Sequence, residues 1–315
     1  MKYLCTYFDY NFMSRGLALY ESIEKHCEDF TFFVLALDEK SECFLKALKK
    51  INVVPIGLDE YITYFGIDVN QYKDKKQFYF SITPNLCLYI LRKYKGIDIL
   101  FYIDADIYFF GPVEKLYDEI SDNSIAICPQ RINKLYSLVA RHYGTYNVGI
   151  NGFRNDEIGL RCLEDWQSDC SSWYPEKPGY PLSFFSDQIF LDTWPQRYER
   201  LKIIKHIGIN TAPWNLLNYR VERSKNAWVV NNTPLIAFHF SSLKKIGANV
   251  WDTELSKYLV RLNKRIAGLY KDYIRHIESF ELQNKNVEKL MFRSKSMTLQ
   301  GFAKRLLGDE LTVEN

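Results

Sequence analysis

The feature that most constrains this chain is an apolar, aromatic run at residues 100–110 that two carboxylates interrupt. The run reads Leu-Phe-Tyr-Ile-Asp-Ala-Asp-Ile-Tyr-Phe-Phe, and its aspartates are Asp104 and Asp106. Turn residues bound it on both sides, so the pattern predicts a buried strand. Carboxylates at the edge of such a strand are costly unless something neutralises them, and Mg²⁺ or Mn²⁺ does so with oxygen ligands. The run therefore predicts a strand that ends at a metal site.

A solvated turn between two strands is the alternative interpretation of the two aspartates. Such turns are rich in Ser, Asn and Gly, because these residues accept the backbone angles and hydrogen bonds of a turn. Here the flanking residues are aromatic and aliphatic instead. The flanks therefore favour the metal site over the solvated turn.

Composition limits the class of protein. The 315 residues suffice for one large or two modest domains, and 47% hydrophobic with 25% charged residues is ordinary for a globular chain. A net charge of +3 is too small to argue for nucleic acid, and we expect no such partner. Aromatic residues are numerous, with 23 Tyr, 21 Phe and 6 Trp, which fits either sugar-contacting surfaces or a tyrosine-rich core.

The cysteines and the N-terminal segment indicate a reducing compartment. Seven cysteines, none in a C-x-x-C pair, suggest neither a disulfide framework nor a zinc site. Residues 1–9 become polar too soon for a signal peptide, and no window approaches the ~18 apolar residues of a spanning helix. We expect a cytoplasmic protein.

The first 56 residues alternate strand and helix, which is typical of a parallel sheet with crossover helices. The expected elements are strands at 2–8, 32–37 and 53–56 and helices at 17–26 and 41–50. Ligands of such sheets lie beyond the carboxyl ends of the strands, which places Thr6, Tyr7 and Asp9 near a bound nucleotide. Neither a G-x-G-x-x-G fingerprint nor a P-loop is present.

The middle of the chain continues the α/β pattern. Residues 58–76 are irregular and charged and predict a loop, and a helix follows over 77–94, where Pro84 predicts a break or a start near Thr83. The later elements are a helix at 113–120, strands at 124–128 and 146–153, a helix at 156–170, a short helix capped by Ser186 and a strand at 236–240. The glycines of the 146–153 strand predict close backbone approach.

A basic, amphipathic segment follows residue 250. Apolar residues keep helical spacing from 255 to 277. The segment from Lys257 to Arg305 contains twelve Lys or Arg residues and four Asp or Glu residues. We place a boundary at residue 250 and treat 251–315 as a helical extension. It is either an ordinary helix packed on the domain or a helix for a membrane surface or a partner.

Four polar features recur in order along the chain. After the two aspartates come Asn147 and Asn151 in one strand, then an Asp-Gln pair at a helix start, then a strand-end histidine followed by lysines. Taken alone, Asp187 could be a helix cap and His239 a core histidine. Their order along an α/β chain favours a shared site.

On these residues the chain resembles GT-A-type nucleotide-sugar glycosyltransferases, most closely the branch like glycosyltransferase family 8 in bacterial surface-glycan loci. The matching segments are Ile103-Asp104-Ala105-Asp106, Tyr146-Asn147-Val148-Gly149, Ser186-Asp187-Gln188, Ala212-Pro213-Trp214-Asn215 and His239-Phe240, together with the opening Thr6-Tyr7-Phe8-Asp9 and Arg15-Gly16-Leu17-Ala18. The resemblance covers about residues 1–250. It implies an α/β GT-A (Rossmann-like) fold, with a mixed central sheet flanked by helices and a helical C-terminal extension, and a transferase domain at 1–250.

The resemblance also implies roles for the residues. Asp104, Asp106 and His239 would hold Mn²⁺ or Mg²⁺ at the nucleotide diphosphate, and oxygen plus imidazole ligands suit Mn²⁺. Asp187 and Gln188 would lie beside the anomeric carbon as the catalytic pair. The residues expected to bind the donor are Thr6, Tyr7, Asp9, Lys75, Lys76, Asp104, Ala105, Asp106, Asn147, Asn151 and Lys244.

The function implied is a metal-dependent glycosyltransferase. It would move a sugar from a nucleoside-diphosphate sugar, with UDP as the favoured nucleotide, to a hydroxyl of a glycan, glycolipid or protein. The transfer would retain the anomeric configuration and would serve surface-glycan synthesis. The basic extension would touch the inner face of the membrane. The chain departs from the resembling enzymes at Ser242, where a glycine is common, and lacks a donor-binding arginine just before the motif.

Three other functions remain as alternatives. A phosphatase with a nucleophilic aspartate would have Thr or Val where Tyr108 stands, and a nucleotidyltransferase would carry a Gly-rich basic loop near its N-terminus. A non-catalytic sugar- or nucleotide-binding protein on a degenerate transferase fold is the third. The presence of the two aspartates, the Asp-Gln pair and the histidine favours an enzyme over this non-catalytic protein.

Overall fold

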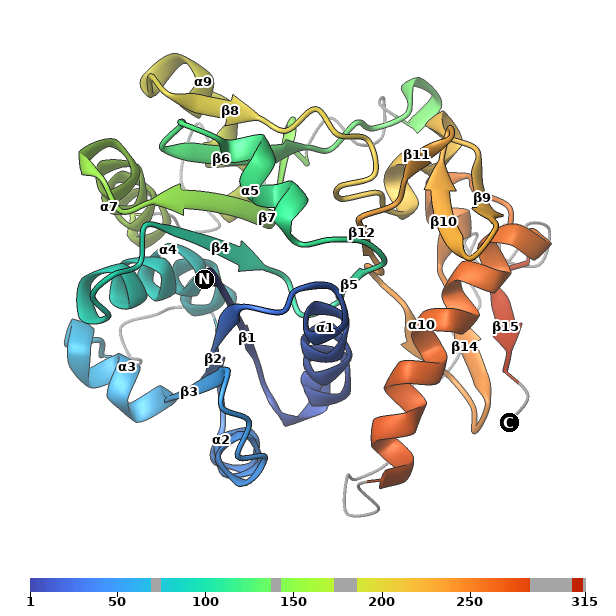
Figure 1. Cartoon of the computed structure of the whole chain (residues 1–315), viewed down its shortest axis with the longest axis horizontal. Helices are drawn as coiled ribbons and strands as arrows, with labels where there is room; N and C mark the ends of the chain where they lie inside the picture. The colour runs from blue at the N-terminus through green and yellow to red at the C-terminus, as the bar shows by residue number, and fades with distance from the viewer. Residues whose placement is uncertain (69–74, 137–142, 173–185, 284–307, 314–315) are drawn as a thin grey trace.

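The computed structural model describes residues 1–68, 75–136, 143–172, 186–283 and 308–313. Its centre is a seven-stranded sheet in the order β3-β2-β1-β4-β7-β6-β8 (Figure 1). The strands are β1 (Lys2–Phe8), β2 (Phe30–Ala36), β3 (Val53–Gly57), β4 (Ile99–Ile103), β6 (Ile125–Pro129), β7 (Tyr146–Arg154) and β8 (Leu201–Ile203). Strands β3, β2, β1 and β4 are parallel, whereas β7 is antiparallel to both its neighbours. The predicted α/β class with a mixed sheet flanked by helices is confirmed.

Helices cover both faces of this sheet, because side chains alternate between two cores along each strand. In β1, Leu4 and Phe8 enter one core, and Cys5 enters the other. The first core is closed by α1 (Met13–His26), α2 (Glu39–Ala47) and α5 (Glu114–Ile120). The second is closed by α3 (Leu58–Phe65), α4 (Lys75–Lys93), α7 (Glu157–Ser171), α8 (Ser186–Ile189), η3 (Phe190–Thr193) and α9 (Trp194–Arg197).

Two expectations for the segment before β4 are wrong. Residues 58–65 form helix α3 rather than a loop, because Tyr61 is fully buried and Gly66, at φ 61°, ends the helix in the left-handed conformation. Helix α4 runs through Pro84 without a break. Ile82 and Leu86, on either side of the proline, are fully buried, and their packing offsets the lost hydrogen bond.

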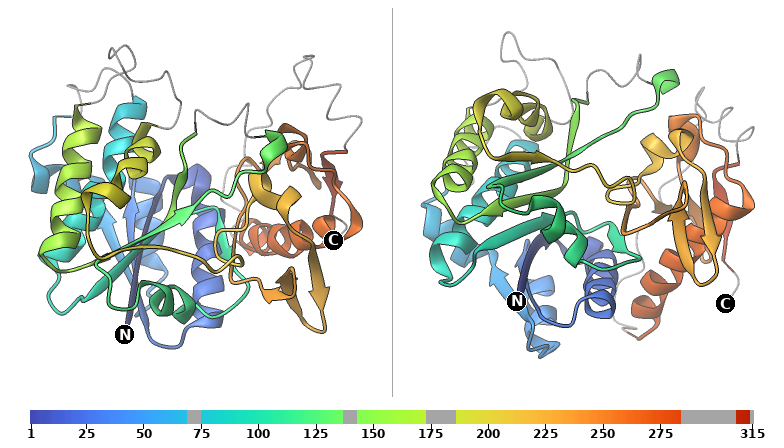
Figure 2. Two further views of the ribbon diagram at one scale, coloured as in Figure 1. Left: turned by 90° about the horizontal axis from the view of Figure 1, so that it is seen from above. Right: turned by 45° about the horizontal axis from the view of Figure 1, so that its top comes forward.

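A second region stands beside the sheet on the side of α1, as Figures 1 and 2 show. Strand β12 (Ala237–His239) pairs with β5 (Ile107–Phe109), which joins this region to the end of β4. Its other elements are η4 (Pro213–Asn218), β9 (Val221–Ser224), β10 (Ala227–Val230), β11 (Thr233–Pro234), β13 (Lys244–Lys245), β14 (Val250–Asp252), η5 (Leu255–Tyr258), α10 (Lys264–Gln283) and β15 (Glu310–Thr312), whereas the short η1 (Tyr10–Phe12) lies between β1 and α1. Its apolar core includes residues of α10 and both strands β12 and β15.

The helix expected over 255–277 is interrupted. A 3-10 turn ends at Tyr258, Leu259 takes a φ of 59°, and α10 begins only at Lys264. Residues 284–307 of the basic extension lie outside the described part of the chain, and the boundary at residue 250 stays a prediction. None of the described helices has both the length and the apolar character that crossing a bilayer requires.

Candidate functional site

The two aspartates lie in a turn between β4 and β5, so the run at residues 100–110 is not the single strand that was expected; the Ile107 N–H closes the turn by donating to the Asp104 carbonyl at 3.0 Å. The Asp104 N–H donates to the Gly149 carbonyl at 2.9 Å, and the Phe240 N–H donates to the Asp106 carbonyl at 2.9 Å. Because β12 pairs with β5 in the register His239↔Ile107, the histidine is brought beside the aspartates from far along the chain. Backbone pairing therefore assembles the cluster.

The side chains of Asp104, Asp106 and His239 form a candidate metal centre. His239 Nε2 lies 3.0 Å from Asp106 Oδ1 and 3.7 Å from Asp104 Oδ2, and one ligand atom from each residue lies within 4.8 Å of the others. The buried His239 Nδ1 has no hydrogen-bond partner among the described residues, and the Nε2 atom faces the carboxylates. Two oxygens and an imidazole nitrogen fit a divalent cation such as Mn²⁺.

Electrostatics in the cluster also favour a cation. Burial raises the pKa of Asp104 despite the opposing charge of His239. For Asp106 burial acts in the same direction, but His239 and the Arg15 guanidinium outweigh it and lower the pKa. The two carboxylates in turn overcome burial and raise the pKa of His239. The two carboxylates thus favour a positive charge beside them, which a protonated His239 or a bound cation would supply.

Gly149 is required for the close approach of the histidine. A Cβ at this position would lie 2.7 Å from Asn147 Oδ1 and 2.8 Å from His239 Nδ1, closer than atoms can pack. The register of β7 against β6 shifts here, since Ile127 pairs with Asn151 and the next residue pairs with Asn147. On the other side of β7, the regular pairing with β4 reaches Ile103↔Ile150, and it places the Gly149 carbonyl opposite the Asp104 N–H. The close approach predicted for the glycines of this strand is confirmed.

A cleft of about 400 Å³ opens beside the aspartates. Its lining residues are Tyr7, Phe8, Asp9, Phe12, Leu37, Tyr79, Tyr102, Asp104, Ala105 and Asp106. Five of the residues predicted to bind the donor are among them. The Tyr102 hydroxyl donates to Asp104 Oδ1 at 2.7 Å, and the rings of Phe12 and Tyr79 are exposed. The cleft therefore joins an aromatic wall to the acidic cluster.

Asp187 and Gln188 lie on α8, which follows the site in the chain by some eighty residues. Asp187 is buried, and burial together with the charge of Asp104 raises its pKa to about 7. Gln188 Oε1 accepts from Asn147 Nδ2 at 2.8 Å and from the Val148 N–H at 3.3 Å. Asp187 thus interacts with the acidic cluster, whereas Gln188 is bonded to β7.

Three other predicted donor residues are engaged within the protein, and a fourth is buried away from the cleft. Asn147 Oδ1 accepts from Asn210 Nδ2 at 3.0 Å, and Asn151 Nδ2 donates to the Val148 carbonyl at 2.8 Å. Lys244 forms an ion pair with Glu254. Thr6 is fully buried and does not line the cleft.

Lys75 and Lys76 begin α4, but their side chains lie outside the described part of the structure, as does the Ser186 side chain. The sequence reasoning assigned no role in the site to Phe12, Arg15 and Tyr79, although the segment that begins at Arg15 belongs to the resemblance. The first two follow the carboxyl end of β1, where the rule that selected Tyr7 and Asp9 also applies. Tyr79 had no comparable signal, because it reaches the cleft from α4.

Comparison with known proteins agrees with this architecture. No protein-family model matches the chain. The protein YfnD of Bacillus subtilis (strain 168) is 23% identical over 225 residues, covering 71% of this chain and 72% of YfnD. YfnF of the same organism is 24% identical over 254 residues, covering 78% of this chain and 82% of YfnF. Both relatives carry the name "uncharacterized protein".

Two solved structures share the fold. The galactosyltransferase LgtC, in complex with donor and acceptor sugar analogs, matches with a TM-score of 0.52 and 14% identity over 88% of this chain and 95% of LgtC. The bifunctional glycosyltransferase WbbM, in its apo structure, matches with a TM-score of 0.52 and 13% identity over 91% of this chain and 51% of WbbM. At such identities the likeness concerns architecture alone. The chain therefore has a GT-A glycosyltransferase fold, with an Asp-Asp-His cluster that could bind a metal.

Proposed function

We propose that this protein is a metal-dependent glycosyltransferase that uses a nucleoside-diphosphate sugar, with UDP as the favoured nucleotide. The observation that carries the proposal is the convergence of His239 with Asp104 and Asp106, two residues that line a cleft, in a GT-A fold. These side chains would hold Mn²⁺ or Mg²⁺. When bound, the ion supplies positive charge to the diphosphate of the donor.

The cleft residues suit a nucleotide. Phe12 and Tyr79 expose aromatic rings on which a base can stack, and Tyr7 lies beside Tyr102 with ring centroids 5.8 Å apart. The Asp9 carboxylate accepts from the Phe12 N–H at 3.0 Å, which holds it at the entrance of η1. In this proposal Asp9 accepts hydrogen bonds from the nucleoside.

Asp187 is the proposed contact to the donor sugar. Its pKa of about 7 means that protonated and ionised forms coexist near neutral pH, so the carboxyl can either donate to or accept from a sugar hydroxyl. Gln188 is held through Asn147 and supports this end of the site. Retention of the anomeric configuration belongs to the proposal by analogy with the resembling enzymes.

The acceptor is proposed to be a hydroxyl of a glycan, glycolipid or protein in surface-glycan synthesis. Contact of the basic C-terminal segment with the inner face of the cytoplasmic membrane is part of the same proposal. Its support is the excess of Lys and Arg over Asp and Glu between residues 257 and 305.

Calorimetry with UDP tests the function. We expect UDP to bind with Mn²⁺ present and to lose measurable binding when EDTA removes the ion. Absence of binding in both conditions would refute the transferase. A panel of nucleotide sugars, assayed for slow hydrolysis, then separates the enzyme from the non-catalytic binding protein, which would bind UDP and hydrolyse none of the sugars.

A further inference from the structure

Strand β15 lies far along the chain from the metal cluster and pairs with β14, two strands away from the segment that carries His239. We infer that β15 supports the site. Asp309, which directly precedes β15, holds in place β13 and η5, the segments that follow His239 in the chain and cover its side chain. The inference rests on the proposed function only for the identity of what His239 binds. The mechanical coupling is a property of the ligand-free protein.

Asp309 is the anchor of this strand. Its carboxylate is 1% exposed and accepts from both the backbone N–H of Ser256, at 2.8 Å, and the Ser256 hydroxyl. Its carbonyl accepts from the N–H and the hydroxyl of Thr253, each at 3.0 Å. Hydrogen bonds to a buried carboxylate are among the stronger ones in proteins. Asp309 therefore fixes both the entry to η5 and its first turn.

The first route from this anchor to the metal cluster passes through η5. Tyr258, two residues after Ser256, packs its ring edge-on to Trp214 with centroids 6.3 Å apart. Trp214 packs edge-on to His239 at 5.1 Å. The Tyr258 hydroxyl also interacts with the side chains of Ser241 and Ser242, just after the histidine. Moving η5 would therefore release the far side of the imidazole.

The second route follows the sheet of β13, β14 and β15. Strand β13 begins five residues after His239, and its Lys244 pairs with Glu254. Just before it, the Leu243 carbonyl accepts from Arg15 Nη2 at 2.9 Å, and Arg15 acts electrostatically on Asp106. The strand ladder thus fixes the segment at a second point close to the cluster.

The backbone of this region needs such support. Ser242, Glu254 and Leu259 have φ values of 68°, 50° and 59°, in the left-handed region that non-glycine residues rarely adopt. Each is unfavourable for a residue with a side chain and persists only where surrounding contacts impose it. Asp309 and β15 provide contacts on either side of Glu254. Without these contacts we expect the three residues to leave the left-handed conformation. The segment that carries His239 should then shift with them.

The two aspartates should not respond in the same way. Asp104 and Asp106 are set by β4, β5 and the Gly149 carbonyl, which lie in or beside the central sheet. Loss of the anchor would therefore displace the third ligand and leave the first two in place. A weaker metal site in an intact fold is the expected result.

The experiment compares three variants: Asp309→Ala, the conservative Asp309→Asn and the matched control Glu310→Gln, whose side chain is exposed on the same strand. Amide hydrogen exchange of the ligand-free protein is the first readout. In Asp309→Ala we expect the Phe240 and Leu259 amides to exchange about tenfold faster while those of β1 and β2 keep their wild-type rates. Asp309→Asn keeps an oxygen for the Ser256 N–H, so its exchange rates at these amides should be intermediate. The rates in Glu310→Gln should match wild type.

Calorimetric affinity for Mn²⁺ in the presence of UDP is the second readout. Asp309→Ala should weaken it about tenfold, at the lower end of what loss of an outer-shell partner costs. Unchanged exchange at Phe240 and Leu259 would overturn the inference, and so would an equal acceleration in β1 and β2, which would signal global destabilisation. If wild-type protein binds neither Mn²⁺ nor UDP, the proposed function fails and the exchange experiment still decides the coupling.

Discussion

Strand β4 carries an aspartate at each end, and the two have opposite surroundings. Asp98, before the strand, is 71% exposed, and its Oδ2 lies 2.6 Å from the Nη1 of Arg154. Asp104, after the strand, is 26% exposed and faces the charges of Asp106 and Asp187. Asp98 is thus paired with an arginine, whereas Asp104 lies among carboxylates that share His239, whose Nε2 is 3.7 Å from Asp104 Oδ2.

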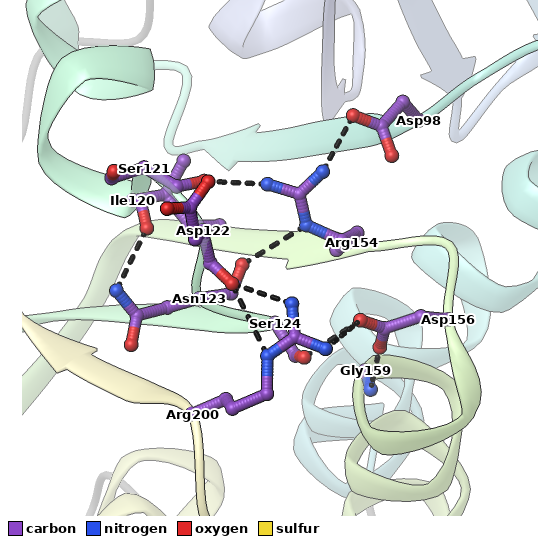
Figure 3. Close-up of polar contacts among 10 residues, drawn as sticks. All are labelled: Asp98, Ile120, Ser121, Asp122, Asn123, Ser124, Arg154, Asp156, Gly159 and Arg200. Carbon is purple, nitrogen blue, oxygen red and sulfur yellow. Dashed lines mark hydrogen bonds and ion pairs between the residues drawn. The ribbon is translucent and has the colours of Figure 1, made fainter.

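At the edge of the sheet around Asp98, two arginines bind carboxylates and backbone carbonyls, as Figure 3 shows. Arg154 also donates to the Asn123 carbonyl at 3.1 Å and to the Ser121 carbonyl. Asp156 caps α7 by accepting from the Gly159 N–H at 2.9 Å, and Arg200 lies 3.3 Å from it. Carboxylates with such partners stabilise the fold. Carboxylates gathered without enough positive charge, as at the other edge, indicate a ligand site.

The largest difference between the two ends should appear in metal-dependent binding. We expect Asp104→Asn to weaken Mn²⁺-dependent UDP binding beyond the roughly hundredfold that outer-shell losses reach, because a ligand itself is lost. Its thermal unfolding midpoint should not fall, since the substitution removes a buried like charge. The matched Asp98→Asn should bind UDP within about twofold of wild type. Equal effects of the two substitutions in calorimetry would abolish the distinction.

The second difference is a pH dependence of stability at the acidic end. The pKa of Asp187, about 7, lies above the unfolded value near 3.9, so ionisation within the fold is unfavourable. The free energy of unfolding of the metal-free protein should therefore fall as pH rises from about 4 through 7. Asp187→Asn removes this dependence and should stabilise the protein at pH 8 on the order of 2 kcal/mol, with no gain near pH 4.

Urea titrations in EDTA at several pH values measure that difference. A gain from Asp187→Asn that is the same at pH 8 and pH 4 would show that the carboxylate does not titrate as the burial and the charge of Asp104 require. A gain confined to high pH would support the charge imbalance at this end of β4.

The smallest effect is expected at the paired end. The Arg154 side chain is 18% exposed and bonds two carbonyls and Asp98, so Arg154→Met should lower the free energy of unfolding by about 1–2 kcal/mol. Arg200→Met should lower the free energy of unfolding by less than about 1 kcal/mol, because the Arg200 side chain is 48% exposed. UDP affinity should stay at the wild-type value in both. A loss of UDP binding in Arg154→Met would show that this end also serves the site.

The local sequence pattern predicted the strands whose apolar side chains are buried. The strands at the start of the chain and the strand before Asp104 appear close to their expected ranges, because apolar alternation and bounding turn residues act locally. Helix α3 and the continuity of α4 through Pro84 were not predictable in this way. Both depend on what Tyr61 and Ile82 pack against, which the sequence does not display.

Within the site, residues that carry an unusual local context were identified, and residues with ordinary context were not. Asp104 and Asp106 interrupt an aromatic strand, and His239 ends a late one. Tyr79 looks like any other aromatic residue in this chain, and only its exposure at the cleft distinguishes it, whereas Phe12 could have been selected by its position after β1.

The sequence by itself determined the α/β class and the chemical character of the site, because hydrophobic period and the cost of burying carboxylates are local properties. Only the tertiary structure decided which charges meet. Pairing of β12 with β5 brings His239 to Asp106, and Arg154 reaches Asp98 rather than Asp104. Strand register and packing between distant segments set those distances, and electrostatic energy depends on distance.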